Sequence, residues 1–229
     1  SSVMVAIVAD GRKGRIYLEP DKEQIQAAFS AIPTWKPEQA INPGLAGNVT
    51  AYGCETFGEL FLPRQLVALN TLCDLIREVR SLVQIDAARA RFPQDERSLV
   101  DNGAGARAYS EAVITYLTFA LSKTLNRSNA FVPWGINVEC PVNLFSRQTI
   151  AFLWDYAESN VIFGPSGSFS SMLDNTIHAL ETIDLGIPRS GSTRQSDAAS
   201  AGKGFANLLI STDPPYYDNA GYADLSDYF

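Results

Sequence analysis

The sequence is poor in cysteine and histidine, which excludes several kinds of site. Its three cysteines, Cys54, Cys73 and Cys140, are too few and too widely spaced for a disulfide scaffold or a cysteine-rich zinc ribbon. This usage predicts a reducing, cytoplasmic setting. The single histidine, His178, excludes a metal site built on a histidine pair and disfavours a serine or cysteine triad. Because His178 lies within a helical apolar pattern, we interpret it as a helix residue, and we predict no metal site.

Long hydrophobic runs are also missing. The longest apolar stretches, such as 112–121, contain polar residues and fall short of the roughly 20 residues that a membrane-spanning helix needs. No signal-peptide pattern opens the chain. With 46% hydrophobic and 19% charged residues, the composition excludes collagen-like, coiled-coil and wholly disordered proteins. We therefore predict a globular protein with no membrane role, whose 229 residues suffice for one large domain or two small ones.

Positive charge is in deficit. The sequence has 18 basic against 25 acidic residues, a net charge of −7. Proteins that hold nucleic acid by charge are usually basic, because their affinity comes largely from neutralising phosphates. Any DNA contact would therefore need a local basic patch or a basic surface from another segment. Arg12, Lys13 and Arg15 form a small basic cluster in a predicted turn, which could touch phosphate but is more typical of a solvated turn.

Hydrophobic periodicity predicts a helix-rich α/β chain with a hairpin near its N-terminus. Asp21 is a candidate N-cap with Gln24 at capping-box spacing, and Pro63 suits the first position of a long helix. We divide the chain into a hairpin with an irregular connection (1–58), a helical region (59–185) and late strands (186–229). The expected strands are 3–8, 15–18, 192–196 and 206–212, and the expected helices are 22–31, 63–83, 106–126, 147–159 and 169–183.

The most informative stretch lies near the C-terminus. The apolar strand expected over 206–212 runs directly into Asp213-Pro214-Pro215-Tyr216. In open α/β sheets, ligands bind at the carboxyl ends of strands. The two prolines fix φ and remove two N–H donors, so the turn is stiff and its carbonyls are left to accept hydrogen bonds. Asp213 and a prolyl carbonyl can accept from an exocyclic amino group, and Tyr216 offers a face on which a planar base can stack.

This motif resembles the catalytic motif of the amino-group DNA methyltransferases, which make N6-methyladenine or N4-methylcytosine from S-adenosylmethionine. The wider sequence is similar to the adenine-specific DNA methylases that carry a DUF1156 domain, and the similarity covers almost the whole chain. The matching blocks follow one another in order: Thr-Phe-Gly-Glu-Leu-Phe (56–61), Pro-Arg-Gln-Leu-Val-Ala-Leu (63–69), Phe-Ser-Arg-Gln (145–148), Trp-Asp-Tyr-Ala-Glu (154–158), Arg-Gln-Ser-Asp-Ala (194–198), Thr-Asp-Pro-Pro-Tyr-Tyr-Asp-Asn (212–219) and Gly-Tyr-Ala-Asp-Leu-Ser-Asp (221–227).

The resemblance implies a catalytic role for the whole turn. Asp213 would accept the hydrogen bonds of the target amine and orient its lone pair toward the sulfonium methyl of S-adenosylmethionine. Pro214 and Pro215 would contribute a carbonyl acceptor. Tyr216 would stack on a base flipped out of the duplex, because the target amine is otherwise paired. Positioning, and the electrostatics of a developing positive amine, would then supply most of the acceleration.

Further residues receive weaker assignments from the resemblance. Asp197 stands where related enzymes place an acidic residue near the cofactor's adenine, but it could equally be a helix N-cap. Pro63 ends the segment Phe61-Leu62-Pro63, which resembles the cofactor-proximal segment that precedes the glycine-rich loop in some of these enzymes, although a simple helix start is the alternative. Tyr217, Asn219 and Tyr222 could line the target-base pocket or be polar residues of a loop.

One departure from the family concerns the methyl donor. A complete enzyme of this type needs a glycine-rich turn after its first strand, where the backbone approaches the cofactor, and the sequence has no convincing one. We therefore predict a piece of a larger methyltransferase, holding part of an incomplete Rossmann-like sheet whose other segments lie upstream and downstream. Alone, the chain is expected to be inactive, to bind S-adenosylmethionine weakly and to self-associate through strand edges, with DNA bound by the full-length protein.

Two functional interpretations stay open. The first is part of a DNA adenine-N6 methyltransferase of a restriction-modification or host-defence system, with N6-adenine favoured over N4-cytosine. The second is a non-catalytic, excised or degenerate methylase domain that recognises a target or binds a partner and keeps the turn for structure. A glycine-rich loop upstream in the parent gene would favour the first interpretation, and its absence the second.

Overall fold

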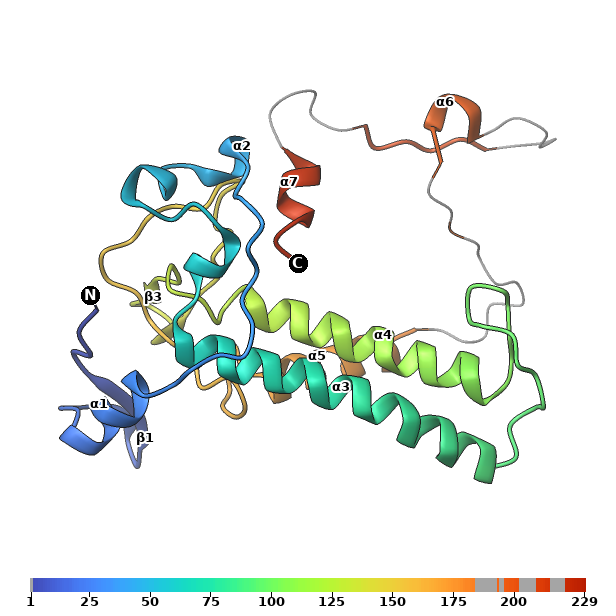
Figure 1. Ribbon diagram of the computed structural model, residues 1–229, viewed down its shortest axis with the longest axis horizontal. Coiled ribbons are helices and arrows are strands. Elements are labelled where there is room, and N and C mark those ends of the chain that lie inside the picture. Colours follow the sequence, from blue (N-terminus) through green and yellow to red (C-terminus); the bar gives the residue numbers. More distant parts are fainter. Residues whose placement is uncertain (1, 184–192, 194–195, 202–208, 215–220) are drawn as a thin grey trace.

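Two long helices organise the molecule. The computed structural model describes residues 2–183, 193, 196–201, 209–214 and 221–229. Helices α3 (Pro63–Arg89) and α4 (Ala106–Leu125) run antiparallel, and α5 (Phe169–Glu181) packs against α4 (Figure 1). The described residues therefore form a mixed structure of helices and small antiparallel sheets, as the α/β prediction implies at its coarsest level.

The other elements are short. A small two-stranded sheet, formed by β3 and β4, lies in the connection between α4 and α5. An eight-residue helix and three single turns precede α3, and two short helices belong to the C-terminal part. These elements are α1 (Lys22–Phe29), α2 (Pro43–Ala46), η1 (Thr50–Tyr52), η2 (Phe57–Leu60), β3 (Trp134–Gly135), β4 (Cys140–Pro141), α6 (Ala198–Ala201) and α7 (Tyr222–Ser226).

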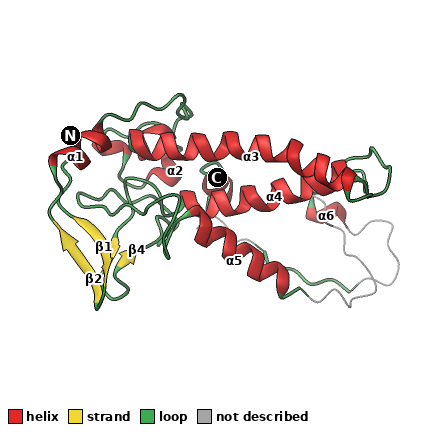
Figure 2. Cartoon of the chain, turned by 90° about the horizontal axis from the view of Figure 1, so that it is seen from below, coloured by secondary structure: helices red, strands yellow, loops and turns green. Residues whose placement is uncertain are grey.

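The predicted N-terminal hairpin is confirmed, with strands β1 (Ile7–Gly11) and β2 (Gly14–Leu18). The first strand expected over 3–8 is shifted toward the turn, because the register pairs Ile7 with Leu18, the last residue of β2, and leaves residues 3–6 without a strand partner. Gly11 pairs with Gly14, which leaves Arg12 and Lys13 as the two residues of the turn. Gly14 has φ of 127°, a conformation that favours glycine, so the sequence specifies where the chain reverses. Figure 2 shows the hairpin at one end of the molecule, away from the middle of α3.

Local capping signals define the helix starts as predicted. Asp21 accepts a hydrogen bond from the Gln24 backbone N–H (2.8 Å), and the Gln24 side chain accepts from the Asp21 N–H (3.0 Å). This reciprocal capping box begins α1. Pro63 occupies the first turn of α3, where a missing N–H costs nothing because that donor has no partner within the helix. The predicted helix start at Pro63 is therefore confirmed.

The helix predicted over 147–159 is wrong. No part of this range is helical, because its backbone donors bond to other segments. The Ile150 N–H donates to the Leu45 carbonyl (2.9 Å), and the Ala157 N–H donates to the Val132 carbonyl (2.8 Å). Ile150 is fully buried in the core formed by these segments. Tertiary packing therefore uses the apolar residues whose spacing suggested a helix.

The late strands are not observed where the structure describes them. Residues 209–212, the described part of the strand expected over 206–212, are neither strand nor helix. Residues 193 and 196, from the strand expected over 192–196, are likewise irregular, and the rest of both ranges lies outside the described residues. A strand requires a hydrogen-bonded partner, and each described sheet is complete as a two-stranded pair. The described residues therefore contain no parallel, Rossmann-like sheet.

Two hydrophobic clusters hold the fold together. One joins α3, α4 and the residues before α5, through Leu69, Ile76, Leu121 and Val161. The other joins the segment before α3 to the connection after α4, and it includes the penultimate residue, Tyr228. The C-terminal end of the chain is thus part of the core. No helix in the described part of the chain combines the length and apolar character needed to cross a membrane.

Candidate functional site: the C-terminal turn and its anchor

The two described residues of the predicted catalytic turn are exposed. Asp213 and Pro214 end the irregular segment 209–214. Leu209 and Ile210, just before them, are 95% and 74% exposed. Figure 1 shows this segment and α6 outside the pair of long helices. The Asp213 carboxylate is therefore accessible, on a segment that the described core does not hold. Pro215, Tyr216, Tyr217 and Asn219 lie outside the described residues.

Beyond the turn, the chain returns to the core through α7. Tyr222, the first residue of α7, is 52% exposed, which is compatible with either of its predicted roles. Leu225 packs against the core cluster that contains Tyr228. The Asp224 carboxylate lies where a Cβ on Gly44 would be 3.0 Å from it, so α7 fits closely against α2. These contacts hold the described residues 221–229, which follow the predicted turn in the sequence, against the core.

Tyr228 is the anchor of this return. It is 7% exposed and packs among the rings of Phe57, Phe61 and Phe145. Its hydroxyl donates to the Leu125 carbonyl (2.9 Å) and accepts from Asn129 Nδ2 (3.2 Å). Burial raises the pKa of Tyr228 well above its ordinary value, because the phenolate would lose hydration. The anchor is thus a neutral phenol with its polar atom satisfied, placed between the helical region and α7.

Asp197 acts as a helix cap in the structure. Its Oδ1 accepts a hydrogen bond from the Ala199 N–H (3.1 Å), and its carbonyl accepts from the Ser200 hydroxyl (3.0 Å). These are the contacts of an N-cap residue, and α6 begins immediately after it. The geometry favours the capping alternative for Asp197, while a role beside the cofactor stays a prediction.

The structure brings two of the matching sequence blocks together. Arg64, one residue into α3, donates from Nε to Glu158 Oε2 (2.9 Å) and from Nη2 to Glu158 Oε1. Burial opposes the charged guanidinium, but the bonds to Glu158 raise the pKa of Arg64 above its ordinary value. The Phe29 ring lies 5.6 Å from the guanidinium carbon, so the pair also contacts α1. Sequence reasoning missed this pair, because 94 residues separate the partners.

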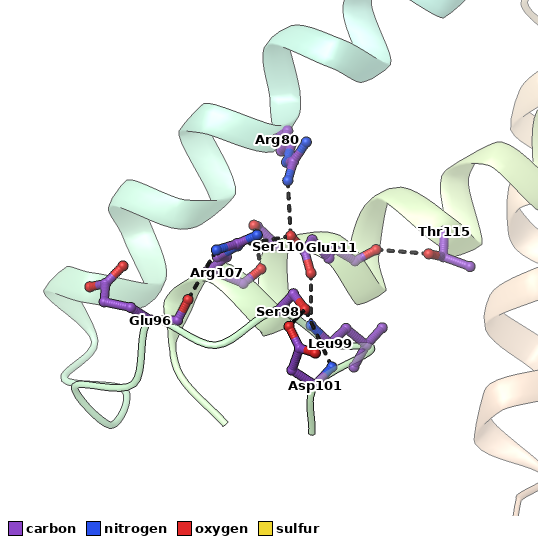
Figure 3. Close-up of polar contacts among 9 residues, drawn as sticks. All are labelled: Arg80, Glu96, Ser98, Leu99, Asp101, Arg107, Ser110, Glu111 and Thr115. Atoms are coloured by element: carbon purple, nitrogen blue, oxygen red, sulfur yellow. Dashed lines mark hydrogen bonds and ion pairs between the residues drawn. The ribbon is translucent and has the colours of Figure 1, made fainter. Parts of the chain in front are cut away.

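The connection between α3 and α4 is organised by two carboxylates. Glu111 of α4 accepts from the Leu99 N–H (2.7 Å), from Arg80 Nη2 (3.0 Å) and from Arg107 Nε (3.2 Å), as Figure 3 shows. Asp95 accepts from the Ala104 N–H (3.0 Å) in the same connection. Sequence reasoning missed this cluster, although the spacing of Arg107 and Glu111, i and i+4 on one helix, is a signal that could have found part of it. Its backbone partners give it a structural role.

The Glu111 cluster predicts a pH dependence of the connection. The bond from the Leu99 N–H, assisted by Arg107 and Arg80, lowers the pKa of Glu111 below its ordinary value of 4.5. A lowered folded-state pKa stabilises the folded connection above the unfolded value, and this stabilisation is lost as the pH falls through the folded value. We expect exchange of the Leu99 amide hydrogen, corrected for its intrinsic pH dependence, to accelerate as the pH falls below the ordinary Glu value of 4.5. Glu111→Gln keeps an acceptor oxygen but cannot titrate, so exchange of the Leu99 amide should lose this pH dependence. An unchanged pH dependence in the variant would contradict the role of Glu111.

A cavity of about 520 Å³ lies beside the anchor, between the start of α3, α4 and the C-terminus. Its walls are mainly apolar and include Phe57, Phe61 and Tyr228, and Asp227 is its charged lining residue. Neither Asp213 nor Asp197 lines it. The described part of the chain also contains no group of three His, Cys, Asp or Glu side chains that could hold a metal ion. No bond between described residues joins Asp213, Asp197 and Pro63 into one site.

Comparison of the chain with protein-family models, with curated proteins and with solved structures found no match.

Proposed function

We propose that this chain is the target-amine part of an S-adenosylmethionine-dependent DNA amino methyltransferase that acts on adenine N6. The observation that carries the proposal is the Asp213-Pro214-Pro215-Tyr216 motif, within ordered blocks that resemble this family. The exposure of Asp213 and Pro214 supports it, because an extrahelical base can reach an accessible carboxylate. The meeting of Arg64 and Glu158 supports it further, because two separate matching blocks then serve one structural unit.

In this proposal, the chain's own residues orient the target. The Asp213 carboxylate accepts the N–H donors of the exocyclic amine and fixes the direction of the nitrogen lone pair. The two prolines would restrict the backbone next to this acceptor, and the ring of Tyr216 would stack on the base. The carboxylate also favours the positive charge that develops on the amine nitrogen.

The described residues do not fit S-adenosylmethionine by themselves. Asp197 uses a carboxylate oxygen to cap α6, and no glycine-rich turn follows a parallel strand within the described part of the chain. We propose that other residues of the full-length protein hold the methyl donor.

A non-catalytic role is the second candidate, and a specific observation favours it. Leu209–Thr212 lies outside any strand, whereas the family resemblance implies a strand that ends at the catalytic aspartate. An excised or degenerate domain that recognises a target or a partner would tolerate this arrangement. The two candidates differ in whether methyl groups reach DNA.

The deciding experiment measures methyl transfer by the full-length protein and by this chain. Tritiated S-adenosylmethionine and duplex DNA are incubated with each protein, and the labelled nucleoside is identified after enzymatic digestion. We expect N6-methyladenine with the full-length protein and none with the chain alone. Calorimetric titration should give the chain a donor dissociation constant weaker than about 10 μM, or −7 kcal/mol. Tighter binding would show a complete donor site here, and an inactive full-length protein would favour the non-catalytic role.

A further inference from the structure

The tip of the N-terminal hairpin carries two exposed basic side chains. Arg12 and Lys13 are the turn residues between β1 and β2, and both are exposed. Within the ranges that the structure describes, neither forms an ion pair. A Cβ on Gly11 would lie 2.8 Å from Ile16 Cγ2, and Gly14 needs its positive φ, so the flanking positions favour glycine. The turn therefore presents two cations with no bulky side chain on either side.

The charge of this tip is not cancelled locally. The nearest charged pair on the hairpin, Asp10 opposite Arg15, neutralises itself through a contact between Oδ1 and Nη1. Two positive charges, from Arg12 and Lys13, then remain at the tip. The Asp10 carboxylate next to the tip is thus already paired with Arg15.

The tip of the hairpin lies beyond its contact with β3, where the Tyr17 ring meets Trp134 with the centroids 6.3 Å apart. Each strand has five residues, which corresponds to about 17 Å at the rise of an extended chain. The Debye length at physiological ionic strength is about 8 Å. Charges that lie farther than this from the tip are largely screened, so the local charge contributes most to binding there.

We propose that Arg12 and Lys13 at the tip of the β1–β2 hairpin bind backbone phosphates of duplex DNA. The inference rests on the proposed function for its choice of DNA as the partner. A two-stranded antiparallel ribbon is narrow enough to enter the major groove, and the described strands of the hairpin pair only with each other. Flexible cations at its tip suit phosphates, which position a protein without reading sequence. The binding should therefore be weak, sequence-independent and sensitive to salt.

The test is the salt dependence of DNA binding by the whole chain, without methyl donor. Fluorescence anisotropy of a labelled 20-base-pair duplex is measured from about 30 to 150 mM salt. Loss of two phosphate contacts in Arg12→Gln with Lys13→Gln should reduce the slope of log K against log salt by about 1.8. The affinity at 50 mM should fall at least about tenfold. The charge-preserving exchange Arg12→Lys with Lys13→Arg should bind like the wild type.

A matched control removes the same charge elsewhere. Arg91→Gln with Lys123→Gln removes two exposed cations, one from the connection between α3 and α4 and one from α4, and should leave the slope unchanged. Equal losses in both double variants, no binding by the wild type, or tip-dependent binding to phosphatidylglycerol vesicles but not to DNA would each overturn the proposal. This experiment measures DNA binding and not methyl transfer. The proposal for the hairpin can therefore be overturned while the role of Asp213 stands, and the role of Asp213 can be overturned while DNA binding by the hairpin stands.

Discussion

Asp213→Ala in the full-length protein is expected to lower the turnover of DNA methylation at least about 100-fold. The substitution removes the acceptor that orients the target amine and favours its developing charge. By analogy, loss of one preorganised hydrogen bond from a transition state costs 10²–10³ in rate, as a rough guide. Donor binding should persist, because we assign Asp213 to the amine. Single-turnover transfer of tritiated methyl groups measures the first effect, and calorimetry of donor binding measures the second.

Three further variants make this result specific. Asp174→Ala removes an exposed carboxylate from α5 and should methylate at the wild-type rate. Tyr216→Phe should be mild and Tyr216→Ala severe, because stacking requires the ring rather than the hydroxyl. Wild-type turnover in Asp213→Ala would show that the turn does not act on the amine.

Tyr228→Ala is expected to lower the free energy of unfolding by about 3–5 kcal/mol. The substitution leaves a cavity among Phe57, Phe61 and Phe145, and it removes the hydroxyl that bonds to Leu125 and Asn129. The free energy of unfolding of a domain is about 5–15 kcal/mol, so a loss of this size is a large share of it. Urea unfolding of the chain, followed by circular dichroism, gives the measurement.

The contributions of the Tyr228 ring and of its hydroxyl to the free energy of unfolding can be separated. Tyr228→Phe keeps the ring and loses the hydrogen bonds, so it should cost about 1 kcal/mol. Tyr222→Ala, at an exposed position of α7, should stay within about 0.5 kcal/mol of the wild type. If Tyr228→Ala were as stable as Tyr222→Ala, the C-terminal segment would not be anchored as described.

The predictable part of the fold is the part specified by neighbouring residues. Asp21 and Gln24 are three positions apart, and the capping box that they form needs nothing from the rest of the chain. The start of α3 at Pro63 is equally local. The range 147–159 has helical spacing, but its N–H groups find carbonyls more than 20 residues away, at Leu45 and Val132. Spacing along the sequence carries no information about such partners.

The candidate site also has a part that neighbouring residues predict and a part that distant contacts determine. The acidic turn was visible because Asp213 follows an apolar run, and the helix-cap alternative for Asp197 needed only the residues after it. The anchor was not visible, because Tyr228 gains its role from Leu125 and Asn129, about one hundred residues earlier. The bidentate pair of Arg64 and Glu158 could not be predicted for the same reason. Contacts between distant segments must be seen in three dimensions.

The connection between α3 and α4 also limits where the sequence can tolerate insertions and deletions. Long surface connections usually accept insertions at little cost, since closing a slightly longer loop costs only a fraction of a kcal/mol, as a rough estimate. Here the backbone is packed on itself: a Cβ on Gly103 would lie 2.1 Å from the Arg97 carbonyl oxygen, and one on Gly105 would lie 2.1 Å from that of Asp95. Glu111 and Asp95 hold the same stretch. An added or deleted residue there would disturb both helices, so the connection should be as intolerant of insertions as a core element.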